Sequence, residues 1–399
     1  MGLFMKSAKV VLVGIGGYGA TFARELMYNP SELIDLVGVV DPYPEKCEVI
    51  DKIYEKNIPV YKCMEDFYSE KKSDLAVIAT PIFLHTQNIL TALSNGSNVL
   101  CEKPLCADEK DIAILKKAQE EAGKFVYIGY QWSFSDAITN LKKDIKYGKF
   151  GKLIEMKTLI LRPRDREYFA RGVGWAGKIK MPDGTPVYDS VANNSAAHYL
   201  FNMQFLMADY GEAAEAMAIS AELLRANDIE NFDTSKIQFE FKEGQKATFI
   251  AAHPVNRAVE PIFEYIFEKG KVYYSVNPVD SSLELLPENY TEFGNIVAFM
   301  DDGEKIVYGN PMANNCKKMY MAADAVLKND MSEGPCGITA TAEHTKLINH
   351  IQKNCEIKNI STKFLKEEDN LLYADGLFEQ AVSCYKDTGK SLNYFTENI

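Results

Sequence analysis

Residues 9–19 read Lys-Val-Val-Leu-Val-Gly-Ile-Gly-Gly-Tyr-Gly, and this stretch decides the fold. The apolar run from Lys9 to Val13 predicts a buried parallel strand. It leads into the pattern G-x-G-x-x-G, whose fixed positions permit a tight turn, a close approach of phosphate to the backbone, and close packing of the next helix. We therefore expect the phosphates of a dinucleotide to lie at the start of that helix, on Gly14, Ile15, Gly16, Gly17, Tyr18 and Gly19.

An acidic residue follows the second expected strand, residues 36–40. Asp41 lies 27 residues after Gly14, and an acid at this place accepts hydrogen bonds from the adenosine ribose and repels a 2′-phosphate. NAD is therefore the expected cofactor, and NADP is the lesser alternative because Lys46 is close in sequence. The other interpretation of the glycines is a turn in an unrelated α/β fold, against which the flanking strand and helix argue.

Strands and helices alternate up to about residue 130. Further strands are expected at residues 75–79, 98–101 and 125–129, with helices at residues 84–93 and 107–122. This alternation predicts an α/β domain over residues 1–130, with the doubly wound parallel sheet of a Rossmann fold and ligands at the carboxyl ends of its strands. Thr80, Lys103 and Tyr130 follow such strands. Lys103 is either a functional side chain or a surface lysine in a loop.

Composition limits the class of protein. A chain of 399 residues is long enough for two domains at roughly 150 residues each. The formal net charge of −12 argues against nucleic acid as a partner. Eight scattered cysteines, five unclustered histidines and no long apolar stretch predict a cytoplasmic protein with no metal site and no membrane span. Residues 6–13 could imitate a secretion signal, but the first strand explains them better.

The pattern changes after about residue 131. A helix is expected at residues 136–147, and strands at residues 153–162, 237–241, 247–252, 261–267 and 271–275. Further helices are expected at residues 317–327, 339–353 and 370–385. We therefore predict a second, α+β domain over residues 131–399, with a large, mostly antiparallel open sheet and C-terminal helices that pack back on it.

Four motifs together resemble the glucose–fructose oxidoreductase / inositol dehydrogenase / MocA family. They are the glycine motif at residues 14–19, Ala79-Thr80-Pro81 with His85, Glu102-Lys103-Pro104, and Gly129-Tyr130-Gln131-Trp132. The resemblance implies an NAD(P)-dependent dehydrogenase of a sugar, a polyol or a related compound, and a homodimer or homotetramer formed through the C-terminal sheet. It places Lys103 beside the nicotinamide and the substrate, before a peptide bond to Pro104 that is often cis. It adds a substrate contact at Trp132 and cofactor contacts at Thr80, Pro81, His85, Glu102, Lys103 and Gln131.

Residues 193–198, Asn-Asn-Ser-Ala-Ala-His, are the other expected catalytic segment. The family has an acid followed by His at the fourth position, on one helix face; here His198 matches and Asn194 stands in place of the Asp. Lys103 and His198 are then the proton carriers, while Asn194 binds a hydroxyl or orients His198. Asp189, five residues earlier, is a candidate substitute for the missing acid. The alternative for His198 is a core histidine on an apolar helix.

A glycine-rich segment, residues 162–187, carries arginines and aromatic residues. In an extended chain Arg162, Arg164 and Arg166 would share one face. One interpretation is a substrate lid in which arginines bind a carboxylate or phosphate and Tyr168 or Trp175 stacks on a sugar. The other is a solvated or intersubunit strand. His253 is either a pocket residue or a strand-end histidine.

Two other functions are consistent with the same residues. One is a non-catalytic nucleotide-binding regulator, which Asn194 in place of an acid favours and the retained Lys103 and His198 oppose. The other is a different reaction on the same fold, such as imine reduction or glycoside cleavage in which the cofactor is regenerated. The sequence does not name the substrate.

Overall fold

The computed structural model describes residues 7–171 and 174–396. Its contacts divide the chain into two compact units. The first unit contains the described residues up to Phe134 together with Tyr210–Glu212 and Asn314–Ala342; the second contains Ser135–Asp209, Ala213–Ala313 and the described residues from Glu343. A single boundary at residue 130 does not account for Asn314–Ala342. No helix in the described part of the chain is long and apolar enough to cross a membrane.

The first unit contains a six-stranded parallel sheet in the order β3-β2-β1-β4-β5-β6. Its strands are β1 (Ala8–Val13), β2 (Ile34–Val40), β3 (Val60–Tyr61), β4 (Leu75–Ile78), β5 (Asn98–Cys101) and β6 (Val126–Ile128). Every residue of β4, β5 and β6 is buried, which the continuous apolar runs of the sequence predicted. The predicted Rossmann sheet is confirmed.

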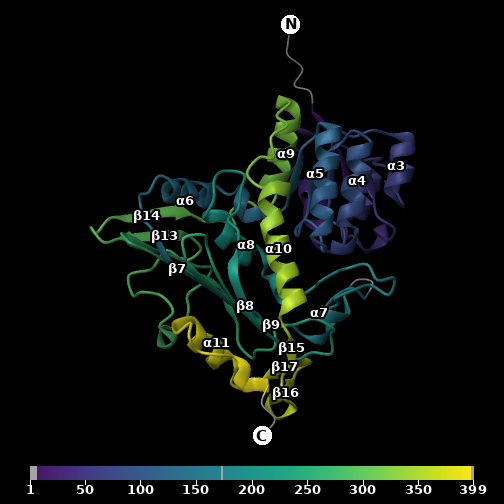
Figure 1. Cartoon of the computed structure of the whole chain (residues 1–399). Helices are drawn as coiled ribbons and strands as arrows, with labels where there is room; N and C mark the ends of the chain where they lie inside the picture. Colours follow the sequence, from purple (N-terminus) through teal and green to yellow (C-terminus); the bar gives the residue numbers. More distant parts are fainter. Residues whose placement is uncertain (1–6, 172–173, 397–399) are drawn as a thin grey trace. The chain divides into compact units, whose positions relative to one another are not determined.

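The helices of this unit are α1 (Gly19–Tyr28), α2 (Ile50–Glu55), α3 (Met64–Glu70), α4 (His85–Ser94), α5 (Lys110–Ala122) and α9 (Lys317–Lys328). Helices α3, α4 and α5 lie side by side (Figure 1). Right-handed crossovers that lead away from β1 in opposite directions place α1 and α4 on opposite faces of the sheet. Helix α9, although distant in sequence, packs on β1, β4 and β5 on the same face as α1.

The register of the parallel strands brings their carboxyl ends to one level. Val13 pairs with Val40 on one side and with Ile78 on the other. Ile78 pairs with Cys101, which pairs with Ile128. The segments that follow β1, β2, β4, β5 and β6 therefore begin along one edge of the sheet, where a doubly wound fold binds its ligand.

The second unit contains a nine-stranded sheet in the order β14-β13-β12-β11-β7-β10-β9-β8-β15. Only β10 with β7 and β15 with β8 pair in parallel, so the sheet is mostly antiparallel, as predicted. Its strands are β7 (Leu153–Leu161), β8 (Met217–Arg225), β9 (Thr234–Glu240), β10 (Lys246–Ala252), β11 (Val259–Phe267), β12 (Gly270–Ser275), β13 (Ile296–Met300), β14 (Lys305–Gly309) and β15 (Ile357–Asn359).

Helices of the second unit cover both faces of this sheet. They are α6 (Asp136–Lys146), α7 (Arg166–Ala170), α8 (Ala197–Leu206) and α11 (Leu377–Lys386), while α10 (Ile338–Asn354) begins in the first unit and ends in the second. Thr158 faces α8, since its hydroxyl meets the Tyr265 hydroxyl to which Asn202 donates. The neighbouring Leu159 packs with Phe378 of α11, on the other face.

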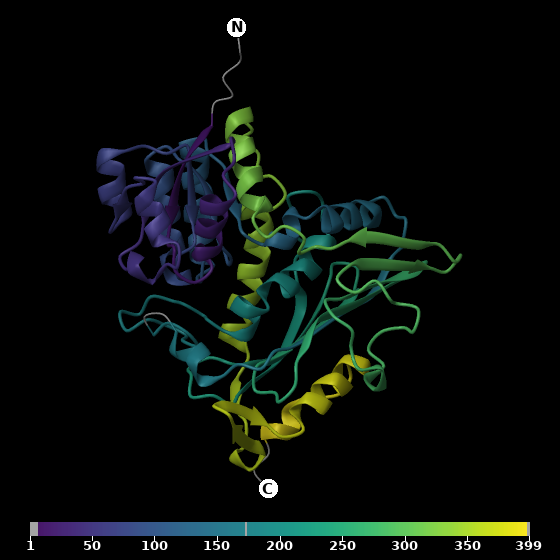
Figure 2. The same cartoon turned by 180° about the vertical axis from the view of Figure 1, so that it is seen from behind.

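Helix α11 runs along the sheet in both views (Figures 1 and 2). It buries an apolar core over β7 and β10. Subunit contact through the rest of this sheet stays a prediction. The helix predicted at residues 370–385 is wrong in its first part, because Leu371–Ala374 form β17 and pair with β16 (Leu365–Glu368).

Candidate functional site

The edge of the first sheet gathers the residues predicted to bind the cofactor. Gly14 follows β1, Asp41 follows β2, Thr80 lies two residues after β4, and Glu102 follows β5. Because these strands end in register, their loops lie along one edge. Gln131, two residues after Gly129, is tied to the glycine loop by the Tyr18 hydroxyl, which donates to Gln131 Oε1 at 2.9 Å.

The glycine loop has the geometry that a pyrophosphate needs. Gly14 has φ +81°, and a Cβ there would lie 2.9 Å from the Ala79 carbonyl oxygen. A Cβ on Gly19 would lie 2.1 Å from the Gly14 carbonyl oxygen, so α1 can start this close only with glycine. Beside Gly16 and Gly17, in contrast, a Cβ would meet no atom within 4 Å. The loop is thus tight against the protein at two glycines and open at the two between them, which fits the phosphates of a dinucleotide.

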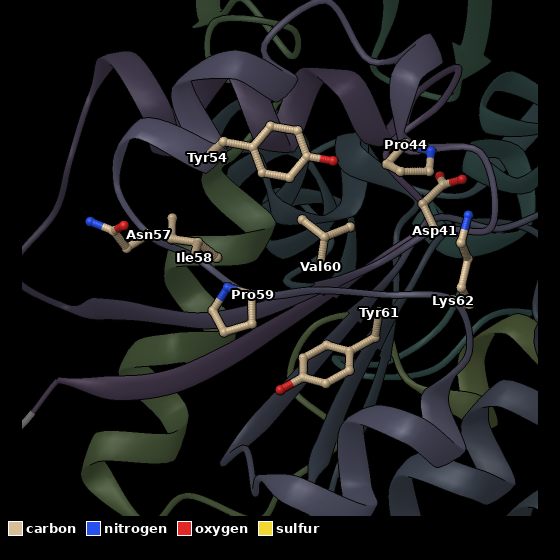
Figure 3. A pocket seen from close by; sticks show the side chains of 9 residues that line it. All are labelled: Asp41, Pro44, Tyr54, Asn57, Ile58, Pro59, Val60, Tyr61 and Lys62. Carbon is tan, nitrogen blue, oxygen red and sulfur yellow. The ribbon is translucent and has the colours of Figure 1, made fainter.

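Asp41 holds the loop from the end of β2. Its Oδ2 accepts a hydrogen bond from Ile15 N at 2.8 Å, and its Oδ1 accepts one from Tyr43 N at 2.8 Å. Each carboxylate oxygen retains a lone pair, which a ribose hydroxyl can use. Asp41 also lines one end of a cavity of about 460 Å³ beside β3, with Lys62 next to it (Figure 3). Lys46, the residue considered for NADP, does not line this cavity and instead lies over the Tyr43 ring at 5.0 Å.

The loop that carries Lys103 is fixed from two sides. The two ring nitrogens of the buried His85 lie 2.6 Å from the Pro104 carbonyl oxygen and 3.0 Å from that of Thr80. Burial lowers the pKa of His85, against the opposing effect of these carbonyls and of Glu102. On the other side, Glu102 Oε2 accepts a hydrogen bond from Lys103 N at 3.3 Å. The Lys103–Pro104 peptide bond is cis, as the resemblance implied.

A residue that the sequence interpretation missed neutralises Glu102. Lys318, at the start of α9, has a fully buried side chain that forms an ion pair with Glu102 and donates to the Gly129 carbonyl oxygen at 3.0 Å. Its Nζ lies 4.7 Å from the centre of the Tyr18 ring. A Cβ on Gly129 would lie 2.7 Å from Glu102 Oε1, so glycine is needed there for the carboxylate to fit. A helix from the far end of the sequence therefore positions the loop of Lys103.

The predicted catalytic segment of the second unit differs from the expected single helix. Asn194 lies in a π-helical turn, Val191–Ser195, and the α-helix begins only at Ala197, after Ala196 departs from helical geometry. Asn194 and His198 are therefore not related as residues i and i+4 of one α-helix. Their places in a substrate site stay predictions.

Asp189 contacts Asn194 directly. The Asn194 Nδ2 donates to Asp189 Oδ1 at 2.7 Å, and Gly177 N donates to Oδ2 at 2.6 Å. Asp189 is 4% exposed, and Arg171 Nη2 lies 3.9 Å from its carboxylate. An acid thus lies beside Asn194, although it belongs to the preceding loop and not to the helix.

The arginines of residues 162–166 do not share one face. Arg162 forms an ion pair with Glu260 at 2.5 Å. Arg166 belongs to α7 and forms an ion pair with Glu367 at 2.6 Å. The extended interpretation fails there because Asp165 caps a helix, accepting from Tyr168 N at 2.9 Å.

Both aromatic rings predicted to stack on a sugar are in contact with a guanidinium group. Arg171 lies over the Tyr168 ring at 3.6 Å and over the Trp175 ring at 5.1 Å. The guanidinium of Arg164 lies 4.5 Å from the Tyr168 ring. In the first unit, the predicted substrate contact Trp132 is 1% exposed.

His253 follows β10 and is buried between the predicted catalytic segment and the arginines. Its Nε2 lies 2.9 Å from Ser195 Oγ, and its Nδ1 lies 2.9 Å from the Arg162 carbonyl oxygen. Burial lowers its pKa to about 3, against the hydrogen bond to that carbonyl and with the help of the charges of Arg164, Arg162 and Arg171. His253 is therefore neutral at physiological pH.

The model of an oxidoreductase family with an NAD-binding Rossmann fold matches residues 8–130. Among curated relatives, the 2,7-anhydro-N-acetylneuraminate hydratase of Mediterraneibacter gnavus is 29% identical over 203 residues, which are 51% of this chain and 50% of that protein. The scyllo-inositol 2-dehydrogenase (NAD(+)) of Bacillus subtilis is 25% identical over 245 residues, 57% of this chain and 68% of that protein. The chain spans half or less of the length of the first curated relatives that it matches.

Solved structures share the fold over most of the chain. The WlbA dehydrogenase from Bordetella pertussis, in complex with NADH and UDP-GlcNAcA, has a TM-score of 0.68 and 19% sequence identity. The similarity covers 87% of this chain and 96% of that one. At this identity the likeness establishes the fold.

Two glycine substitutions should separate binding from folding. We expect Gly16→Ala to keep the stability of the protein, because its Cβ meets nothing, but to weaken NADH binding by roughly tenfold or more by filling the phosphate site. Gly19→Ala should also destabilise the fold, because its Cβ meets the Gly14 carbonyl. NADH fluorescence titration and thermal melting measure the two effects. Unchanged NADH affinity in Gly16→Ala would contradict the assignment.

Removal of the buried cation should cost more than removal of an exposed one. Lys318→Met leaves the carboxylate of Glu102 buried without its partner, so we expect a loss of about 3–5 kcal/mol in the free energy of unfolding. Glu102→Gln/Lys318→Met should recover most of it. The control is Lys328→Met on the same helix, whose exposed pair with Asp324 predicts a change within about 0.5 kcal/mol. Urea unfolding at neutral pH measures all three; equal losses for both single lysine variants would refute the argument.

The lowered pKa of His253 predicts a pH dependence of stability. In the unfolded chain this histidine takes up a proton below about pH 6.5, whereas in the folded chain it does so only near pH 3. The free energy of unfolding therefore decreases as the pH is lowered across this window. Between pH 6.5 and 5 one such group accounts for about 2 kcal/mol. His253→Gln should lose less stability over this range by that amount, whereas the same change at the exposed His350 should not. Identical pH profiles for the wild type and His253→Gln would contradict the prediction.

Proposed function

Because the chain belongs to the glucose–fructose oxidoreductase / inositol dehydrogenase / MocA family of NAD-binding oxidoreductases, we propose that it transfers hydride between NAD and a hydroxyl-bearing carbon of a sugar, a polyol or a sugar derivative. The observation that carries the proposal is the edge of the first sheet. There a glycine loop open at Gly16, the carboxylate of Asp41 and the fixed loop of Lys103 follow strands that end in register.

The proposed reaction divides its work between cofactor and protein. Bound NAD supplies the acceptor for the hydride that leaves the carbon. The chain must take up the proton of the hydroxyl as the carbonyl forms, and Lys103 and His198 are the side chains proposed for this transfer. The contact of His85 with the Pro104 carbonyl oxygen and the hydrogen bond that Lys103 N donates to Glu102 support Lys103, because a proton acceptor has to be held in place.

Asp189 is proposed to supply the negative charge that Asn194 lacks. An amide cannot accept the hydroxyl proton, but Asn194 donates to Asp189 and is thereby oriented by it. The remaining capacity of Asn194 can then hold a substrate hydroxyl. The family's acid is in this view moved from the helix to the loop before it.

A second candidate function rests on the names of the relatives. Two of them are named hydratases, and another is named a dehydrogenase. A hydratase reaction has no net oxidation, so if NAD takes part in it, the cofactor has to be reduced and regenerated within one turnover. The two candidates share the site and differ in whether NADH accumulates.

Replacement of Lys103 tests the proposal. We expect Lys103→Ala to lower kcat by about 10²- to 10⁴-fold, the range of a lost acid–base group, with NADH affinity nearly unchanged. Lys110→Ala, at an exposed lysine on the neighbouring helix, serves as the control and should keep full activity. The assay follows NADH absorbance and, separately, substrate conversion over a panel of sugars, inositols, uronic acids and amino sugars.

The same assay separates the candidates. NADH formation that matches substrate loss supports the dehydrogenase, whereas substrate conversion at constant NADH supports the hydratase-type reaction. Full turnover in Lys103→Ala would exclude Lys103 from either reaction.

A further inference from the structure

The second unit concentrates positive charge around one ring. The guanidinium groups of Arg164 and Arg171 lie 4.5 Å and 3.6 Å from the centre of the Tyr168 ring. Arg162 is close enough to both Arg164 and His253 to affect their protonation. Among the described residues, two acids balance this group: Glu260 pairs with Arg162, and Asp189 lies 3.9 Å from Arg171.

Arg164 is the cation without an acid. It forms no hydrogen bond and no ion pair with any residue of the described chain, and its Nε is buried without a partner. Burial and the charges of Arg162 and Arg171 lower its pKa, against the effect of Tyr168 and Glu260. A guanidinium that is half-buried and repelled by its neighbours is unfavourable unless an anion joins it.

This charge is continuous with the predicted catalytic segment. The Tyr168 ring lies 5.4 Å from the His253 ring, and His253 contacts Ser195 Oγ at 2.9 Å. Ser195 is adjacent to Asn194, which donates to Asp189. His253 is neutral and thus adds no charge of its own.

We propose that Arg164, assisted by Arg171, binds an anionic group, a carboxylate or a phosphate, that the substrate carries away from its reacting carbon. The planar guanidinium presents paired N–H donors that match both groups. That this anion belongs to the substrate rests on the proposed function; that the second unit binds an anion here does not.

The test uses three probes with a shared sugar ring: D-glucose, D-glucuronate and D-glucose 6-phosphate. We expect the wild type, titrated calorimetrically without NAD, to bind at least one anionic probe about tenfold or more tightly than glucose. Arg164→Gln should lose that preference. Arg164→Lys should retain part of it, because lysine keeps the positive charge but lacks the paired N–H donors of the guanidinium. The matched control is Arg166→Gln, two residues away, whose exposed partner is Glu367; its preference should be unchanged.

The outcomes are distinct. Equal affinity of the wild type for all three probes, or an anion preference that survives in Arg164→Gln, overturns the inference. So does a change in sedimentation of Arg164→Gln with unaltered anion binding, which would make Arg164 a contact between copies of the chain. Anion binding lost in Arg164→Gln but with no turnover of any sugar supports the inference while the proposed function fails, because the titration needs no hydride transfer. Circular dichroism melting of Arg164→Gln should stay close to that of the wild type, since among the described residues the side chain loses its contact with the Tyr168 ring but no hydrogen bond and no ion pair.

Discussion

The carboxylate of Glu102 is the constraint on which the first unit depends. A negative charge buried at the end of β5 is tolerated only with a cation and hydrogen-bond donors around it. Lys318 supplies the cation, and this requirement fixes α9 against the sheet although α9 lies more than 200 residues further along the chain. Gly129 leaves the space for the carboxylate, and the other oxygen accepts from Lys103 N. The residues that neutralise and accommodate Glu102 therefore also position the loop of Lys103.

The second unit solves a different electrostatic problem. Asp189 lies beside Asn194, which donates to it, and Arg171 lies 3.9 Å from its carboxylate. Arg162 is neutralised by Glu260. Arg164 is left without a paired acid among the described residues, and burial, together with the charges of these arginines, keeps His253 neutral. An excess of one positive charge beside a segment of polar side chains is an arrangement in which an anionic ligand lowers the free energy of the whole group.

Much of the first unit could be predicted from sequence because its signals are local. Apolar runs mark buried strands, and the glycines at 14 and 19 are required by backbone contacts within a few residues or one strand away. In the second unit, β8 was missed because its residues Ala218, Ala221 and Glu222 do not favour strands; pairing with β9 decides their conformation. The predicted single helix through Asn194 and His198 and the predicted extended conformation at Arg166 were wrong for the same reason. Asp165, Ser190 and Ala196 set helix boundaries through local hydrogen bonds and backbone angles that apolar periodicity does not report.

The sequence indicates one member of a long-range charge pair but does not identify the other. Lys318 lies four residues before Ala322 on the buried face of α9, and a lysine at such a position must have a partner. Nothing local identifies that partner, since Glu102 is 216 residues away. Arg164 gives the opposite case, because none of the described residues around it is an acid that forms an ion pair with it. A charged residue among apolar positions thus requires a partner of opposite charge. The fold supplies this partner for Lys318, and at Arg164 we infer that a ligand supplies it.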